Sequence, residues 1–240
     1  HAALAERLQW MQDTYRLDDS DVLMQKAPIS FDVSVWECFW PLITGARLLI
    51  AGPGEHRDPH RIAELVRQFG VTTLHFVPPL LALFIEESQS AECTSLRRLF
   101  SGGEALPAEL RNRLLEQLPN AQLHNRYGPT ETAINVTHWQ CSVDDGERSP
   151  IGRPLGNVIC RVLDEQLNPL PAGVPAPAER TEPGRQSRYV GPGAARHGSG
   201  PAANAHGTPG PAGGPWQPVE QQRPRRRAAA DKRGHPDGAE

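Results

Sequence analysis

The stretch HNRYGPTETAINVTHW, residues 124–139, places a ring side chain, a tight turn, a hydroxyl and a carboxylate in close succession. Gly128 opens a Gly-Pro turn that presents Thr130 and Glu131 together. A threonine hydroxyl can donate a hydrogen bond to a phosphate oxygen, and carboxylates are ligands that Mg²⁺ prefers. The spacing therefore suits nucleotide chemistry. A surface turn before an acidic helix start explains the stretch equally well.

Two side chains just before this turn suit a purine base. The ring of Tyr127 can stack on the base, and the Asn125 amide can bond its exocyclic amine. Taken alone, these residue types leave the nucleotide interpretation and the plain turn both open.

A second stretch, FSGGEALP at residues 100–107, pairs two glycines between an apolar run and a helical pattern. Gly102 and Gly103 would let the backbone approach a flat or anionic ligand closely. A plain strand-to-helix turn is the simpler interpretation of a Gly-Gly pair on its own. Neither the G-x-x-x-x-G-K-[ST] nor the G-x-G-x-x-G nucleotide motif occurs in the chain.

The third stretch, SFDVSVWE at residues 30–37, contains a carboxylate between an aromatic and a β-branched residue. A partly buried Asp32 would need a cationic partner. The same residue could instead cap the helix that follows, and spacing alone favours neither role. His75 lies in an apolar strand pattern, where a histidine is more often a core residue than a ligand.

The elements that must position these loops alternate between helical and strand patterns over the first 175 residues. Helices are predicted at 4–15, 35–45, 58–70, 79–87 and 106–119. Strands are predicted at 21–27, 47–51, 72–78, 96–103 and from 122, with a strand pair within 157–173. The alternation predicts an α/β fold, a mainly parallel sheet covered by helices. Ligands in such folds sit at the carboxyl ends of the strands, where the three loops lie.

The composition restricts the class of protein. The chain has 25 basic and 28 acidic residues, so its bulk charge indicates neither nucleic acid nor membrane as a partner. Four scattered cysteines without a C-x-x-C pair disfavour a disulfide or metal framework and favour the cytoplasm. There is no apolar run of 18 residues and no signal-peptide pattern.

The composition changes sharply near Pro175. From Ala176 onward Gly, Pro, Ala and Arg dominate and Leu, Ile, Phe and Met are absent, so residues 176–240 are predicted to be disordered. The predicted division is therefore a folded part at 1–175 and a disordered tail at 176–240.

Taken in order, SFDVSVWECFWPLITGARLLIA, TLHFVP, LFSGGEALP, NRYGPTETAINVTHW and IGRPLGNVICRVLDEQLNPLPAGVP resemble the amino-acid adenylation domains of nonribosomal peptide synthetases. These domains belong to the adenylate-forming enzymes, and the resemblance covers 1–175. It implies the large N-terminal domain of those enzymes. The pairing of FDVSVWE with YGPTE favours this branch over the acyl-CoA ligases.

The resemblance implies a reaction in which ATP and an α-amino acid give an aminoacyl-AMP and pyrophosphate. A phosphopantetheine thiol on a carrier domain then takes the aminoacyl group, within an assembly that also contains condensation domains. By the same resemblance the nucleotide site comprises Gly103, Glu104, Ala105, Asn125, Tyr127, Gly128 and Thr130. Thr130 would act on the phosphate and Glu131 would bind Mg²⁺.

The resemblance also implies a substrate pocket. Asp32 would pair with the α-ammonium group of the substrate. The other pocket positions are Val33, Trp36, His75, Phe100, Gly102, Arg126, Ile134 and Asn135. Val33, Trp36 and His75 resemble the pattern of serine-activating domains. An apolar residue is expected at the position of Arg126. The arginine could instead pair with an acidic side chain of the substrate.

Several family segments do not occur in the chain: a phosphate loop ending in Pro-Lys-Gly, a Thr-Gly-Asp that holds the ribose, and the C-terminal domain with its catalytic lysine. We therefore expect this polypeptide to be inactive, and the tail is hypothesised to be out of frame. Two alternatives stay open: a non-catalytic nucleotide- or partner-binding remnant, and a fragment of an acyl-CoA ligase.

Overall fold

A seven-stranded sheet lies at the centre of the computed structural model, which describes residues 1–156, 158–164, 166 and 168–171. The strand order is β2-β1-β3-β4-β5-β6-β7. The strands are β1 (Val22–Gln25), β2 (Arg47–Ile50), β3 (Thr73–Phe76), β4 (Arg98–Gly102), β5 (Gln122–Tyr127), β6 (Thr137–Gln140) and β7 (Arg153–Pro154). The first five in spatial order pair in parallel, and β6 and β7 pair antiparallel. The predicted α/β class is confirmed; the predicted tail at 176–240 lies outside the described residues.

In the described part of the chain, five α-helices connect or flank these strands. They are α1 (Ala2–Tyr15), α2 (Val33–Thr44), α3 (Pro59–Phe69), α4 (Pro78–Glu86) and α5 (Ala108–Gln117). Short 3₁₀ turns lie at η1 (Glu55–Arg57), η2 (Ser90–Glu92) and η3 (Thr130–Thr132). The bounds of α3 follow from local chemistry: the Asp58 side chain accepts from the backbone N–H groups of His60 and Arg61, and Gly70 ends the helix at φ 64°.

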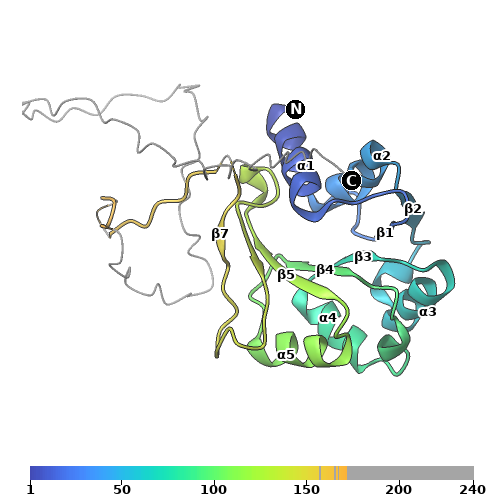
Figure 1. Ribbon diagram of the computed structural model, residues 1–240. Helices are drawn as coiled ribbons and strands as arrows, with labels where there is room; N and C mark the ends of the chain where they lie inside the picture. The colour runs from blue at the N-terminus through green and yellow to red at the C-terminus, as the bar shows by residue number, and fades with distance from the viewer. Residues whose placement is uncertain (157, 165, 167, 172–240) are drawn as a thin grey trace, which may run out of the picture. The chain divides into compact units, whose positions relative to one another are not determined.

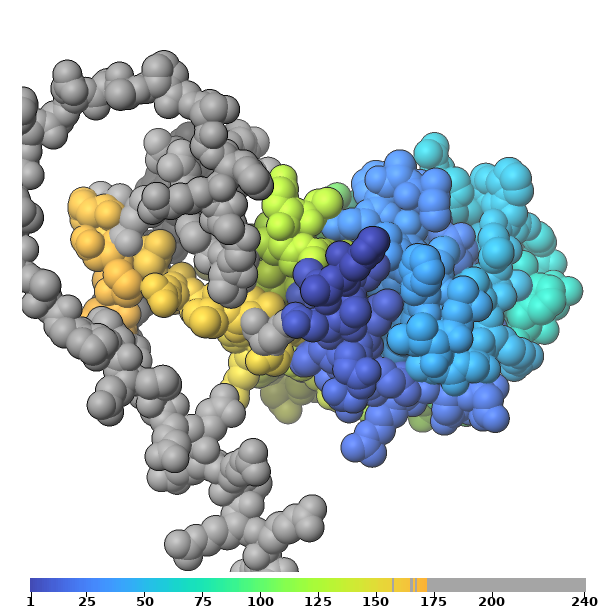
Figure 2. All heavy atoms as spheres, turned by 90° about the horizontal axis from the view of Figure 1, so that it is seen from above, coloured from blue at the N-terminus to red at the C-terminus, as the bar shows by residue number. Residues whose placement is uncertain are grey.

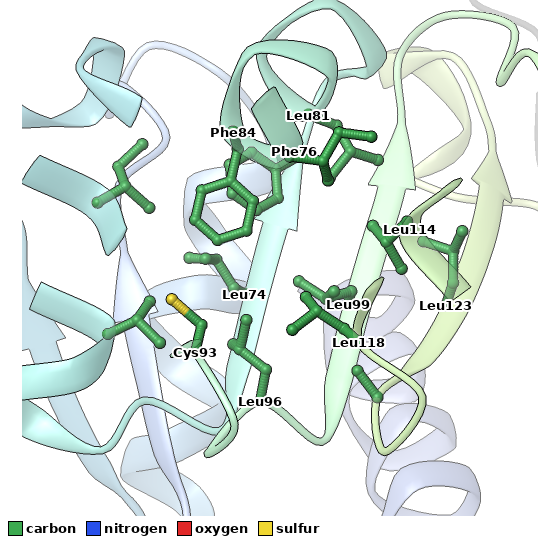
Figure 3. Packing of buried hydrophobic residues seen from close by; sticks show 14 of the residues in the cluster. Leu74, Phe76, Leu81, Phe84, Cys93, Leu96, Leu99, Leu114, Leu118 and Leu123 are labelled. Atoms are coloured by element: carbon green, nitrogen blue, oxygen red, sulfur yellow. The ribbon is translucent and has the colours of Figure 1, made fainter. Parts of the chain in front are cut away.

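The helices form two layers, one on each face of the sheet (Figure 1). Because successive side chains of a strand point to opposite faces, Leu74 and Phe76 of β3 face α3, α4 and α5, whereas His75 faces α2. Figure 3 shows the first layer, in which Leu81 and Phe84 of α4 pack on the strands. The second layer packs α1 and α2 on the other face of the same strands.

The antiparallel end of the sheet differs from the sequence prediction. His138 contacts Trp10 edge to face at 4.7 Å, and Trp139 packs on the larger core. They also form β6, a strand that the sequence pattern did not indicate.

Of the strand pair predicted within 157–173, the described residues form a short antiparallel pairing and no longer strand. Leu163 and Pro169 form an isolated bridge, the Asp164 N–H donates to the carbonyl of Asn168, and the Leu170 N–H donates to the carbonyl of Val162, each at 2.9 Å. Ile159 and Val162 are each 56% exposed, so the segment has no core to pack against, and a lone pair of strands is marginal in water.

Within the described ranges, no helix is both long and apolar enough to cross a membrane.

Candidate functional site

The three loops gather at the carboxyl edge of the parallel strands. The strand register pairs Ser101 with Asn125 and Gly102 with Arg126, so β4 and β5 end side by side. The loop that leads into α2 follows β1, which lies one strand beyond β3 in the same sheet. Since parallel strands point in the same direction, all three loops leave the sheet at one edge.

The loop after β5 folds back on its own strand. The backbone N–H of Val136 donates to the carbonyl of Tyr127 at 2.8 Å, and the Thr132 hydroxyl donates to the carbonyl of Pro129 at 2.7 Å. A Cβ atom on Gly128 would lie 2.5 Å from the Cα of Asn135, so only glycine permits this fold.

The closed loop presents the predicted nucleotide-binding side chains to solvent. Tyr127 is 38% exposed, and Thr130 and Glu131 are exposed on η3. The structure therefore groups the ring, the hydroxyl and the carboxylate on one surface loop. Their contacts with a nucleotide stay predictions.

Two residues of this loop adopt an unusual backbone conformation. Ala133 has φ 62° and Ile134 has φ 77°, values that cost a β-branched residue steric energy. Ile134 is nevertheless buried in the α1–α2 core, and the Arg7 Nε of α1 donates to the carbonyl of Ala133 at 3.3 Å. Figure 2 shows α1 in dark blue beside the yellow-green atoms of this loop. Helix α1 therefore holds the loop in its strained form.

The loop after β4 is also shaped by glycine. A Cβ atom on Gly102 would lie 2.7 Å from the carbonyl oxygen of Arg126, and Gly103 has φ 89°. Glu104 and Ala105 are exposed and line a groove of about 340 Å³ between the first turns of α4 and α5. The described lining of this groove does not include Asn125, Tyr127 or Thr130.

Asn125 is buried, and its Nδ2 donates to the carbonyl of Pro150 at 2.8 Å. This bond directs the amide nitrogen toward the segment that follows β6. It leaves the amide oxygen as the acceptor that an exocyclic amine would need.

Four of the predicted pocket residues form one cluster on the α1–α2 face. The ring centroid of Trp36 lies 5.4 Å from that of Phe100 and 6.0 Å from that of His75, both edge to face. The Arg126 Cζ lies 5.4 Å from the Trp36 centroid and 5.0 Å from the Phe100 centroid. The pKa of His75 is well below its usual value because of burial and the nearby Lys26 and Arg126 cations, so its imidazole is neutral.

The other pocket residues lie around this cluster. Asp32 is the residue before α2 and is half-buried, and its side chain makes no helix-capping hydrogen bond. The capping role considered for Asp32 is therefore not realised. Val33 and Ile134 pack on the α1–α2 core, and Asn135 is buried in the loop after β5.

Sequence reasoning missed one residue that holds the Asp32 loop. Glu37 of α2 is fully buried, and its Oε2 accepts from the backbone N–H groups of Lys26 and Ala27 at 3.1 and 2.8 Å. These bonds fasten the start of the loop that leads to Asp32. The signal was available: an acidic residue in the apolar run VWECFW is unlikely to be buried without backbone partners.

The buried Glu37 should make stability depend on pH. Burial raises its pKa from 4.5 to about 7, so its contribution to stability is complete below pH 4.5 and is lost as the pH rises to about 7. The shift corresponds to about 3 kcal/mol. Lys26, whose pKa is lowered to about 8 by burial, stays charged in this window and does not mask the effect.

We therefore expect Glu37→Gln, which removes the titrating group, to flatten the pH profile. Urea unfolding at pH 4.5 and pH 7 should show the wild-type free energy of unfolding falling about 3 kcal/mol more than that of the variant. Parallel profiles for the two proteins would contradict this assignment.

Comparison with known proteins places this site in a family. Residues 1–177 match the family model described as AMP-binding enzyme. The chain therefore belongs to the AMP-binding enzyme family.

Two relatives similar in sequence show which kind of AMP-binding enzyme the chain resembles. The chain is 50% identical over 176 residues to phosphinothricin tripeptide synthetase PhsB of Streptomyces viridochromogenes, which covers 73% of this chain and 15% of that protein. It is 45% identical over 181 residues to enterobactin synthase component F of Escherichia coli K12, covering 72% of this chain and 14% of that protein. The chain is a partial adenylation domain of the nonribosomal peptide synthetase type.

A solved structure has the same fold. The nonribosomal peptide synthetase FmoA3, bound to α-methyl-L-serine-AMP, matches with a TM-score of 0.67 and 30% identity over 71% of this chain and 20% of that chain. The same protein has also been solved in an AMPPNP-bound form. The predicted large-domain fold of adenylate-forming enzymes is thereby confirmed.

Proposed function

We propose that this chain carries part of a site that activates an α-amino acid with ATP, giving aminoacyl-AMP and pyrophosphate. The observation that carries the proposal is the loop after β5, which Gly128 allows to close and which presents Tyr127, Thr130 and Glu131 together. Tyr127 stacks on the adenine and Thr130 donates to the phosphate. The AMPPNP-bound relative supports ATP as the nucleotide.

Gly103, Glu104, Ala105 and Asn125 complete the nucleotide site in this proposal. Asn125 accepts from the adenine amine through its amide oxygen, since its Nδ2 already donates to the carbonyl of Pro150. Gly103 brings the backbone after β4 close to the base, because its φ of 89° turns the chain there.

Glu131 is the proposed magnesium ligand. An exposed carboxylate beside a phosphate-binding hydroxyl fits Mg²⁺, which binds through one or two carboxylates together with substrate phosphates. The ion would neutralise charge that develops on the phosphates. Glu131 would determine where the ion binds relative to the phosphates.

Asp32 sets the substrate class. It is half-buried and free of a capping role, so its carboxylate suits the α-ammonium group of an amino acid. An acyl-CoA ligase would have no use for an anion at this place. The substrate is accordingly an α-amino acid with a polar side chain. His75 and the relative bound to α-methyl-L-serine-AMP suggest a serine-like one, and Arg126 suggests an acidic one as the alternative.

The aminoacyl group would pass to a phosphopantetheine thiol on a carrier domain, with a condensation domain as a further partner. The synthetase relatives support this assignment. The 240-residue chain spans about 15% of the length of the first of them. We infer that the isolated chain binds AMP without activating an amino acid.

AMP binding to the purified chain tests this proposal. Stacking on one base is worth about 1–3 kcal/mol, so Tyr127→Ala should weaken AMP binding in calorimetry about tenfold. Phe39→Ala, which removes another exposed aromatic ring on α2, is the matched control and should leave the affinity unchanged. Equal affinities for wild type and Tyr127→Ala would refute the assigned role.

Amino-acid-dependent pyrophosphate exchange separates activity from binding. We expect none from the isolated chain with any amino acid. Exchange above background would overturn the inferred inactivity. AMP binding without exchange would fit both a catalytic fragment and a non-catalytic remnant. To distinguish them, the chain can be joined to the remaining segments of a synthetase relative: exchange by this fusion would identify a catalytic fragment.

A further inference from the structure

Among the described residues, Arg126 is a buried cation without a hydrogen-bond acceptor. It lies on β5 with 2% of its surface exposed, and Nε, Nη1 and Nη2 of its guanidinium have no hydrogen-bond partner in the described part of the chain. The rings of Trp36 and Phe100 flank it at 5.4 and 5.0 Å. Ring faces attract the cation, but they satisfy none of its N–H donors.

Other buried arginines in this protein have acceptors. Arg111 of α5 is fully buried, and its Nη2 donates to the carbonyl of Gly146 at 2.7 Å. Arg98 of β4, a partly buried arginine whose side chain is 14% exposed, donates to Asp21 at 2.9 Å. Burying a charged donor group without a partner destabilises a folded protein. Arg126 is therefore the exception, and stability of the empty protein does not explain it.

The charges around Arg126 favour an anion. Burial lowers the pKa of Arg126, and the Tyr15 phenol is the group that opposes this shift. Lys26 and Arg126 both lower the pKa of the neighbouring His75, so two cations lie near that ring. A guanidinium binds a planar carboxylate through two parallel N–H···O bonds, which no hydroxyl can match.

Asp32 and Trp36 are four residues apart at the start of α2, a spacing that places side chains on one face of a helix. Trp36 in turn contacts Arg126. Trp36 therefore neighbours Asp32 along its own helix and contacts Arg126 across the cluster. An α-amino acid with an acidic side chain would complement both charges, with its ammonium at Asp32 and its side-chain carboxylate at Arg126.

We propose that Arg126 selects an acidic amino acid, aspartate or glutamate, as the substrate of this site. The inference rests on the proposed function and sharpens its substrate class. A serine-like substrate would leave the guanidinium unpaired and is the outcome that the experiment must exclude.

The test measures binding of L-glutamate, L-glutamine, L-aspartate, L-asparagine and L-serine to the 240-residue chain, by calorimetry or tryptophan fluorescence. We expect one of the two acids to bind about 10- to 100-fold more tightly than its amide and than serine, since hydrogen bonds to charged groups are the strong ones. Which acid it is identifies the substrate.

Arg126→Met should reduce the preference for acid over amide to within about threefold. Because the variant removes an unpaired buried charge, its thermal midpoint should equal or exceed that of the wild type. Arg111→Met is the matched control: it removes a buried arginine that has acceptors, so it should lower the midpoint and keep the preference of whatever protein remains folded.

Each other outcome overturns the inference. Equal or tighter binding of serine or of the amides by the wild type would refute it. An equal loss of affinity for all five amino acids in Arg126→Met would assign Arg126 to the α-carboxylate instead. If no amino acid binds, the inference fails for this chain, and AMP binding in the same samples shows whether the proposed function fails with it.

Discussion

Replacing Gly128 by alanine is expected to open the loop after β5. The added Cβ would lie 2.5 Å from the Cα of Asn135, 2.7 Å from the carbonyl oxygen of Ile134 and 2.8 Å from the backbone N of Val136. All three are backbone atoms, so no side-chain rotation relieves the overlap. The loop must open, and the Val136–Tyr127 hydrogen bond that closes it breaks.

Two measurements follow for Gly128→Ala. The free energy of unfolding should fall by about 3 kcal/mol in urea. AMP affinity should fall about 100-fold or more, because the ring and the hydroxyl that are proposed to meet the base and the phosphate are both displaced. Gly54→Ala is the control: Gly54 has φ 86° with nothing within 4 Å, so alanine there should cost about 1 kcal/mol and leave AMP binding intact. Folded Gly128→Ala protein with wild-type AMP affinity would show that the loop does not need this glycine.

Arg98→Met is expected to cause the largest loss of stability away from the site. Its Nη1 donates to Asp21 at 2.9 Å, and the Asp21 side chain has no exposed surface. Removing the cation leaves a buried carboxylate without its main partner, so the free energy of unfolding should fall by about 3–5 kcal/mol. The Arg98 Nε also donates to the carbonyl of Tyr15, so the variant loosens the end of α1.

Arg97→Met provides a matched comparison for that prediction. Arg97 lies 3.5 Å from the same carboxylate, but its side chain is 56% exposed, so its removal should cost less than about 1 kcal/mol. Equilibrium unfolding of both variants in urea measures the two losses. Similar losses for Arg97→Met and Arg98→Met would contradict the view that burial decides the strength of this pair.

Local signals predicted most of the parallel part of the fold. Asp58, Pro59 and Gly70 mark the two ends of α3 by capping and backbone chemistry that acts within a few residues. The order of the elements predicted the parallel sheet in the same way. The antiparallel strand β6 was not predicted. Its pairing with β5 depends on the loop that Gly128 allows to close, and the residues of β6 have no strand pattern of their own.

The site was predictable to different degrees. Trp36, His75, Phe100 and Arg126 were expected in one pocket, and the structure brings their side chains into one cluster. That no described residue accepts a hydrogen bond from Arg126 could not be foreseen, because it depends on every neighbour that packs around the guanidinium. The role of Glu37 was not predicted for a similar reason. Its partners are backbone N–H groups, which every residue except proline has, so the sequence does not show which of them it binds.

The side chains of strand β5 alternate between the two faces of the sheet, so the proposed nucleotide contact and the proposed substrate contact lie on opposite faces. Leu123 belongs to the core under α4 and α5, and Asn125 bonds to Pro150, whereas His124 and Arg126 contact Phe100 on the α1–α2 face. Adjacent residues thus serve the proposed base contact and the proposed substrate contact from opposite sides of one backbone. If both proposed roles hold, a substitution at residue 126 should change which amino acid is accepted without moving Asn125. The strand would then provide a position at which substrate specificity can change independently of nucleotide binding.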